Sequence, residues 1–241
     1  MINVIIPTLN AEGHIHKLLK SLKIQSIPRE IIVVDSSSSD NTVKIAESYG
    51  VKTIKIKRED FNHGGTRNLA ASNATGDIIV FLTQDALPFD EFLIEHLVRP
   101  LNNLSIVASF GRQVPRDGAN PAETFARLFN YPDTSLVKDK DSIGRMGIKA
   151  FFFSNVCSAI RKREFQEIGG FPERVIMNED MVLAAKLILR GYKIAYVPEA
   201  KVIHSHNYTW RQQFKRYFDI GVSLRDNSWI LEYAKAGREG A

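Results

Sequence analysis

The chain of 241 residues contains a single cysteine, Cys157. One cysteine excludes an intramolecular disulfide and is typical of a reducing compartment. Cys157 lies within the apolar run 156–160. We therefore expect it to be buried and do not expect it to act as a nucleophile.

Long apolar runs are also missing. No stretch of about 18 apolar residues occurs, so the sequence predicts no membrane-spanning helix. The N-terminus has no basic leader, and its short apolar run ends at Pro7, which argues against a signal peptide. We expect a cytoplasmic protein.

The charge is mildly basic, with 32 Lys and Arg against 27 Asp and Glu and a net charge of +5. This favours anionic partners such as nucleotide phosphates, acidic lipids or nucleic acid. The basic residues are dispersed and no reader motif is present, so we expect no nucleic-acid partner. A composition of 44% hydrophobic and 24% charged residues is that of a folded globular protein.

The first half of the chain alternates between strand and helix patterns. Buried β-branched runs alternate with amphipathic segments, an order that predicts a parallel sheet with helices on both faces. Ligands of such sheets bind at the carboxyl ends of the strands. The predicted strands are residues 2–6, 30–34, 51–56 and 78–82, and the predicted helices include 14–24. Residues 64–74 are predicted to be a loop that runs into a helix.

The second half is less regular. Three prolines interrupt a polar stretch between residues 112 and 141. We predict strands at 106–110, 151–160, 193–197 and 201–203, helices at 122–128, 163–168 and 180–189, and a basic aromatic helix from Trp210 onward.

Polar residues follow the first two predicted strands. Asp35 ends the second strand before a run of small hydroxyl residues that includes Ser37. A carboxylate there can accept the ring N–H of a pyrimidine, or it can simply cap a turn. Pro7, Thr8 and Asn10 follow the first strand and are candidates for the same nucleotide pocket.

Residues 61–68 form a glycine-containing segment that leads into a helix. Gly64 allows close approach of the backbone to a ligand, and Arg67 can make a forked contact with phosphate. His63 is a further candidate for nucleotide-sugar binding. The alternative is a flexible loop with a helix cap.

Asp85 follows the strand at 78–82 and is a candidate metal ligand. A hard cation that bridges a diphosphate needs few protein oxygens. His204 and His206 come just after the last strand and could complete the ligand set, with His63 as a looser candidate. Gln84, beside Asp85, is a candidate for the nucleotide-sugar pocket.

Glu179 and Asp180 open an amphipathic helix. Either carboxylate could act as a general base toward a sugar hydroxyl, and at a helix start we expect it to be well hydrated and ionised. They could instead only complement the helix dipole. The basic aromatic helix after Trp210 could contact phosphate, a membrane surface or a partner, or could simply close the domain.

Taken together, these segments resemble family 2 glycosyltransferases of the GT-A fold over residues 1–221. The segments that carry the resemblance are 4–10, 31–42, 81–86, 169–171 before 178–180, and 213–217. Within the family, residues 61–68, 82–86 and 111–113 are similar to a rhamnosyltransferase-like branch.

The resemblance implies an inverting enzyme that uses a nucleoside-diphosphate sugar. Asp35 would hold the pyrimidine, Asp85 would bind Mg²⁺ or Mn²⁺, and Asp180 would be the catalytic base with Glu179 beside it. Gln213 and Arg216 match an element near the diphosphate and acceptor. Two residues depart from the family pattern: Thr83 replaces the first aspartate of the DxD motif, which weakens the expected metal affinity, and Tyr217 replaces a tryptophan.

We therefore predict an α/β protein with a Rossmann-like, mostly parallel central sheet. A single domain at 1–221 would contain a nucleotide-sugar half (1–105) and an acceptor half (106–205), and 206–241 would form the C-terminal helical segment. The expected reaction adds one rhamnose from dTDP-rhamnose to a lipid-linked bacterial surface glycan at the inner membrane face. The alternatives are a UDP-sugar donor, a nucleotidyltransferase, or a sugar-binding module without turnover.

Overall fold

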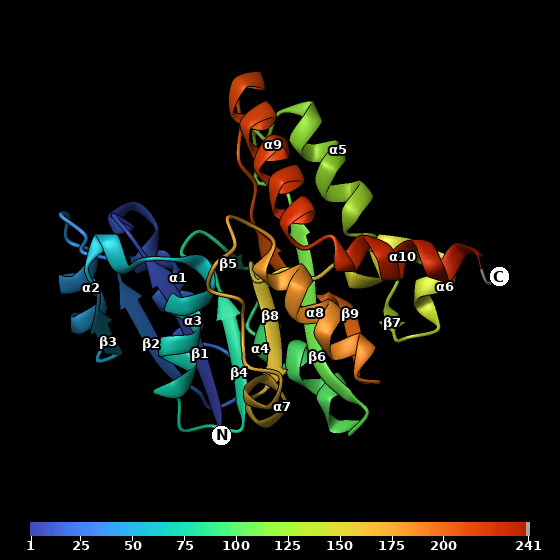
Figure 1. Cartoon of the computed structure of the whole chain (residues 1–241). Helices are drawn as coiled ribbons and strands as arrows, with labels where there is room; N and C mark the ends of the chain where they lie inside the picture. The colour runs from blue at the N-terminus through green and yellow to red at the C-terminus, as the bar shows by residue number, and fades with distance from the viewer. Residues whose placement is uncertain (240–241) are drawn as a thin grey trace.

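One nine-stranded mixed sheet runs through the centre of the molecule, in the order β3-β2-β1-β4-β8-β6-β9-β5, with β7 paired to β9 (Figure 1). The computed structural model describes residues 1–239, so residues 240 and 241 of the predicted C-terminal segment lie outside the described residues. The strands are β1 (Ile2–Thr8), β2 (Glu30–Asp35), β3 (Lys52–Lys55), β4 (Ile78–Leu82), β5 (Leu87–Pro88), β6 (Ile106–Val114), β7 (Leu136–Lys138), β8 (Cys157–Arg161) and β9 (Lys193–Ile203).

Helices cover both faces of this sheet, as the alternating pattern predicts. They are α1 (Glu12–Lys23), α2 (Thr42–Ser48), α3 (His63–Ser72), α4 (Leu93–Val98), α5 (Pro121–Asn130), α6 (Ser142–Met146), α7 (Lys162–Glu167), α8 (Glu179–Leu189), α9 (Trp210–Asp226) and α10 (Trp229–Glu239), with short 3₁₀ turns η1 (Arg58–Asp60), η2 (Arg99–Asn102) and η3 (Gly147–Phe151).

The core has two layers because successive strand residues point to opposite faces. In β1, Ile5 packs into the layer formed with α3, α7 and α8, whereas Val4 and Ile6 pack into the layer formed with α1, α2 and α4. Strands with both faces buried read as continuous apolar runs. This is why the sequence located β1, β2 and β4 correctly.

In the second half of the sheet, β6 lies where a strand was predicted, but another predicted strand is wrong. Residues 151–160 are not one strand: η3 ends at Phe151, and β8 begins only at Cys157. Between them, the backbone and side chain of Asn155 donate to the carboxylates that open α8 instead of to a neighbouring strand. β8 then runs antiparallel to both β4 and β6, so the sheet is mixed.

The predicted strands at 193–197 and 201–203 are parts of one strand, β9. Its pairing with β6 shifts register between Gly111 and Arg112, where residues 198–200 bulge outward. Gly111 permits this bulge, because a Cβ there would lie 2.4 Å from the Ala200 carbonyl oxygen. β9 therefore continues to the carboxyl edge of the sheet.

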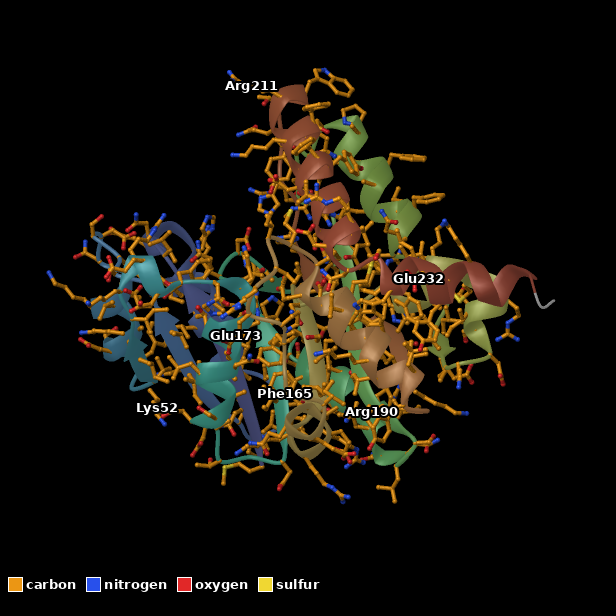
Figure 2. The ribbon with its side chains drawn as sticks, viewed as in Figure 1. Lys52, Phe165, Glu173, Arg190, Arg211 and Glu232 are labelled. Atoms are coloured by element: carbon orange, nitrogen blue, oxygen red, sulfur yellow. The ribbon has the colours of Figure 1, made fainter. Side chains whose placement is uncertain are left out.

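Helices α5 and α9 project beyond the sheet, with the start of α9 farthest from it (Figure 1). Arg211, in the first turn of α9, lies at this outer tip (Figure 2). Thr209 caps α9 through a capping box with Gln212. Within residues 1–239, every helix is too short or too polar to cross a lipid bilayer.

Candidate active site

The carboxyl ends of β1, β2, β4, β6 and β9 meet at one edge of the sheet, together with the segment that precedes β8. A cavity of about 540 Å³ opens there, between this edge and helices α5 and α9. It brings together most of the residues that the sequence suggested for metal binding and catalysis. Its lining includes His63, Asp85, Asp180, His204, His206, Gln213 and Arg216.

Three of these residues form a cluster suited to a metal ion. One ligand atom from each of Asp85, His204 and His206 lies within 4.8 Å of the other two. Both imidazole Nε2 atoms are 3.5 Å from the Asp85 Oδ2 atom. Burial, aided by the neighbouring His204, lowers the pKa of His206 to about 4. The His206 ring is therefore uncharged at neutral pH and can act as a ligand.

Gln113 of β6 orients His204. Its Oε1 atom accepts from Arg127 Nη1 at 2.7 Å and from His204 Nδ1 at 2.8 Å. Because Arg127 can only donate, Oε1 is the acceptor and Nδ1 of His204 carries the proton. The Nε2 atom that faces Asp85 then carries no proton and is free to bind a metal ion. Metal-bound histidines usually donate their other ring N–H to an acceptor in this way.

A second polar network, on α5, supports this orientation, and its residues were not among those that the sequence suggested. Glu123 and Arg127 are four residues apart on the helix and form an ion pair in which both side chains are largely buried. Glu123 Oε1 also accepts from the His206 backbone N–H at 3.2 Å. The one sequence signal for this ion pair was the spacing of four residues between opposite charges on a predicted helix.

Asp180 lines the same cavity but is not the hydrated carboxylate that the sequence suggested. Its Oδ2 atom accepts from the Asn155 N–H at 3.2 Å, and its Oδ1 atom accepts from the Met181 N–H at 2.8 Å. Burial, and then the negative charge of Glu179, raise the pKa of Asp180 well above its usual range. The expectation of good hydration was therefore wrong, because the cavity wall desolvates this helix start.

Glu179 faces away from the cavity. Its carboxylate pairs with Arg67 Nη1 at 3.4 Å and accepts from Asn155 Nδ2 at 3.3 Å. Arg67 is almost fully buried and also donates to the His63 carbonyl oxygen. The ion pair thus joins the start of α3 to the start of α8, and Glu179 does not line the cavity beside Asp180.

A smaller cavity of about 270 Å³ continues from the first toward β1, and His63 and Thr83 line both. Arg58 and Phe61 also line it, and Arg58 was not among the residues that the sequence suggested. Gln84 spans this end of the sheet: its side chain accepts from the Leu9 N–H and donates to the Leu9 carbonyl.

Gly64 has a packing role. It lies within the first turn of α3, and a Cβ there would be 2.1 Å from the Pro172 carbonyl oxygen. The helix therefore begins earlier than expected, capped by Asn62, whose side chain accepts from the Gly65 N–H. The expected loop at this position is a helical turn.

Asp35 does not line the smaller cavity, but it is hydrogen-bonded to Thr8, which does. Its carboxylate accepts from Thr8 Oγ1 at 3.0 Å and from both the backbone N–H and the hydroxyl of Ser38. Asn10 accepts from the Ser39 N–H, and Ser37 donates to the Ile56 carbonyl. The structure therefore brings Asp35 and its neighbours together as a turn. Their contact with a base stays a prediction.

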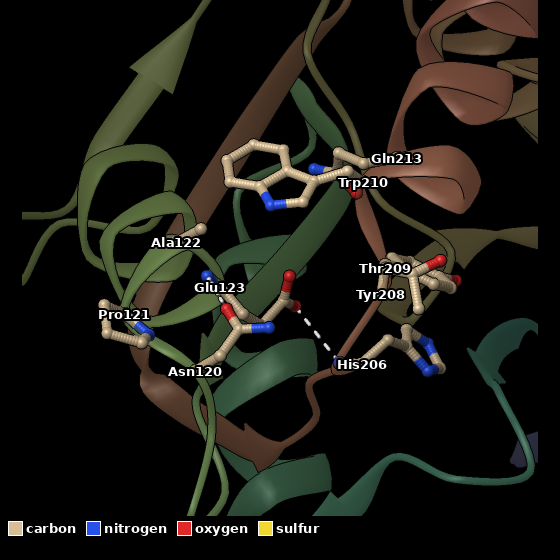
Figure 3. A pocket seen from close by; sticks show the side chains of 9 residues that line it. All are labelled: Asn120, Pro121, Ala122, Glu123, His206, Tyr208, Thr209, Trp210 and Gln213. Atoms are coloured by element: carbon tan, nitrogen blue, oxygen red, sulfur yellow. Dashed lines mark hydrogen bonds between the residues drawn. The ribbon is translucent and has the colours of Figure 1, made fainter.

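A third cavity, of about 530 Å³, lies between the starts of α5 and α9. Figure 3 shows Trp210 and Gln213 across from Pro121 and Ala122, with the bond from the His206 backbone to Glu123 below them. This cavity shares four lining residues with the cavity of about 540 Å³: Glu123, His206, Tyr208 and Gln213. The cleft therefore extends outward along α9.

A model of the family described as "Glycosyl transferase family 2" matches residues 3–169. The chain belongs to this family. The match includes Asp35, Asp85 and all of β8, but ends before Asp180 and the two candidate metal ligands His204 and His206.

Curated relatives extend the similarity of this family 2 glycosyltransferase over nearly its whole length. It is 47% identical to the O-antigen chain rhamnosyltransferase RfbN of Salmonella typhimurium, over 99% of this chain and 77% of that protein. It is also 47% identical to the O-antigen chain rhamnosyltransferase WbaN of Salmonella anatum, over 88% of this chain and 68% of that protein.

Solved structures confirm the fold. Residues 1–349 of Staphylococcus aureus TarS give a TM-score of 0.65 at 21% identity, over 83% of this chain and 59% of that one. A mannosyltransferase from Pyrobaculum calidifontis, solved with GDP-Man and Mn²⁺, gives 0.66 at 20% identity, over 98% and 73%. The predicted GT-A fold class is therefore confirmed.

Proposed function

We propose that this glycosyltransferase transfers one rhamnose from dTDP-rhamnose to a hydroxyl group of a growing surface glycan, with inversion at the anomeric carbon. The observation that carries the proposal is that Asp180 and the Asp85–His204–His206 cluster line one cavity. The two Salmonella relatives, both rhamnosyltransferases of O-antigen chains, support rhamnose as the sugar.

The donor would lie across the first half of the molecule (residues 1–105) and the acceptor against the second (106–205). We assign the pyrimidine to the loops after β1 and β2, near Thr8, Asn10, Asp35 and Ser37. The Asp35 carboxylate already accepts three hydrogen bonds, so the ring N–H of a base would take its remaining acceptor position, on Oδ2, or displace Ser38. His63, Arg67 and Gln84 would then face the ribose and diphosphate from the smaller cavity.

Several buried polar atoms in this cleft have no hydrogen-bond partner among the described residues, and they support a polar ligand. An unpaired buried polar group costs about 1–3 kcal/mol, which a bound ligand can offset. The atoms are Arg67 Nε, Thr83 Oγ1, Asn178 Nδ2 and Gln213 Oε1. We assign Gln213, with Arg216, to the diphosphate and sugar.

Asp85, His204 and His206 fit a divalent cation that accepts both oxygen and nitrogen ligands. Mg²⁺ prefers an all-oxygen shell, whereas first-row transition metals accept imidazole. The two histidines therefore favour Mn²⁺ over Mg²⁺. When bound, such a cation neutralises charge on the leaving diphosphate.

Asp180 would act as the general base. Its two backbone hydrogen bonds fix the carboxylate at the cavity wall, and its raised pKa makes it a stronger base than an exposed aspartate. The acceptor hydroxyl gives its proton to Asp180 as its oxygen bonds to the anomeric carbon. The bond from that carbon to the diphosphate oxygen breaks, and dTDP leaves with the electron pair.

A contact with the membrane surface would bring the enzyme to a lipid-linked acceptor. The exposed side chains of α9 include Trp210, Phe214 and Phe218 as well as Arg211 and Lys215. Aromatic and basic side chains on one projecting helix favour the interface of an anionic bilayer. Sedimentation with phosphatidylglycerol vesicles tests this: replacing Trp210 and Phe214 with Ala should lower the bound fraction.

Calorimetry of a donor panel, with and without Mn²⁺, tests the proposed function. The panel contains dTDP-rhamnose, UDP-glucose, UDP-GlcNAc and GDP-mannose. We expect dTDP-rhamnose to bind most tightly and Mn²⁺ to strengthen its binding. Preference for a UDP-sugar would overturn the donor assignment. Tight binding without hydrolysis or transfer would identify a binding module instead of an enzyme.

A further inference from the structure

The cavity of about 540 Å³ that Asp180 lines is here called the catalytic cavity. A separate cavity of about 340 Å³ adjoins it at the C-terminal end of α5. Small-molecule pockets commonly have volumes of about 300–1,000 Å³. Asn130 and Phe152 line both cavities. The wall of this adjoining cavity is largely apolar, and its main side chains are Phe110, Phe129, Leu136, Met146, Phe152 and Tyr196.

The adjoining cavity also carries two lysines and no carboxylate among its lining residues. Lys138 is only 2% exposed, donates to the Phe152 carbonyl and lies 4.8 Å from the centroid of the Phe110 ring. No acidic side chain pairs with it in the described part of the chain. Lys149 is exposed, 4.6 Å from the centroid of the Phe129 ring.

A buried ammonium group without a counter-charge is costly. Burial accordingly lowers the pKa of Lys138 to about 7. An anion in the cavity would stabilise the charged form, and the aromatic wall would cover an apolar group attached to it. The cavity is therefore suited to an amphiphilic anion, which has a negative charge for Lys138 and an apolar group for the aromatic wall.

We propose that this adjoining cavity binds the phosphate and the first apolar units of an acceptor that is linked to a lipid phosphate. The inference rests on the proposed function, because it places the acceptor's lipid end beside the cavity in which Asp180 meets its hydroxyl. The smaller cavity of about 270 Å³, which we assign to the donor, shares His63 and Thr83 with the catalytic cavity. It shares no lining residue with the adjoining cavity. Donor and acceptor lipid thus enter from different sides.

Farnesyl phosphate, titrated into the protein without donor, tests the site directly. We expect saturable one-to-one binding, with farnesol and inorganic phosphate each at least tenfold weaker. Lys138→Met keeps the apolar bulk and removes the charge, and should weaken farnesyl phosphate binding at least tenfold. Equal binding of farnesol and farnesyl phosphate would overturn the role of the cation.

A second variant covers the case in which Lys138→Met fails to fold. Ser135 is exposed at the cavity rim, so Ser135→Trp should fill the mouth without disturbing the core and weaken binding at least tenfold. Ser48→Trp on α2, also exposed and far from the cavity, is the matched control. Unchanged farnesyl phosphate affinity in Ser135→Trp would refute the site.

Transfer assays separate this inference from the proposed function. In Ser135→Trp, the KM for a prenyl-phosphate-linked acceptor should rise at least tenfold, whereas the KM for dTDP-rhamnose should not change. A wild-type protein that binds farnesyl phosphate but not dTDP-rhamnose would contradict the proposed function alone. Equal KM changes for both substrates would contradict the adjoining cavity as an acceptor site.

Discussion

Removing one member of the buried ion pair between Arg67 and Glu179 should strongly destabilise the fold, because it leaves the other charge buried and unpaired. The two side chains are 5% and 9% exposed and join α3 to α8. Glu179→Gln would leave the guanidinium buried without a counter-charge. Breaking a buried pair costs about 3–5 kcal/mol. The contact is long, at 3.4 Å, and the Gln amide oxygen can still accept, so we expect about 2–3 kcal/mol here.

For a chain of this length, each kcal/mol lowers the melting temperature by about 2–4 °C. Glu179→Gln should therefore lower it by about 4–12 °C in differential scanning calorimetry. Arg67→Met should be similarly destabilising. The double variant should lose less stability than the sum of the two single variants, because neither charge is then left unpaired.

Glu47→Gln is the control, because both side chains of the Glu47–Lys55 ion pair are exposed to solvent. Exposed pairs contribute about 0–1 kcal/mol. If Glu179→Gln shifted the melting temperature no more than Glu47→Gln does, the structural role of the Arg67–Glu179 pair would be refuted. A fully additive double variant would refute the coupling between its two members.

Three further predictions concern the site, and a fourth concerns the bulge between β6 and β9. Asp180→Asn should lower kcat by about 10²–10⁴-fold while dTDP-rhamnose binding in calorimetry is retained, and near-native turnover would exclude Asp180 as the base. Because its folded-state pKa is raised, ionisation of Asp180 opposes folding: wild-type stability relative to Asp180→Asn should fall as the pH rises from about 4 through the raised pKa, and a constant difference in melting temperature would contradict this. Gln113→Leu should weaken Mn²⁺ binding by about 10–100-fold in calorimetry, and Gln113→Glu, which keeps the acceptor, should weaken it less; equal losses would argue against orientation of His204. Gly111→Ala should cost at least about 1–3 kcal/mol in chemical unfolding, because its Cβ would meet the Ala200 carbonyl, whereas Gly13→Ala in α1, with open space around it, should be neutral or stabilising; equal effects would contradict the tight β6–β9 bulge.

Much of the site was visible as single positions in the sequence. Asp35 and Asp85 stand at the ends of buried apolar runs, and such runs predict strands from local pattern alone. Glu179 and Asp180 stand at the start of an amphipathic helix for the same reason. The sequence could not divide their roles, because neighbouring helix residues point in different directions. Only the tertiary structure brings Arg67 of α3 to Glu179 and leaves Asp180 at the cavity.

The sequence by itself therefore determined the family, the α/β class and the candidate residues, since these depend on local periodicity and short motifs. The tertiary structure decided which candidates meet. The pairing of β5 with β9, which sets Leu87 opposite Ile203, brings His204 and His206 to Asp85, more than a hundred residues earlier in the chain. Gln113 on β6 and Glu123 and Arg127 on α5 then support them. Burial also changed the chemistry of Asp180, because desolvation depends on what packs around a carboxylate and not on the residues beside it in sequence.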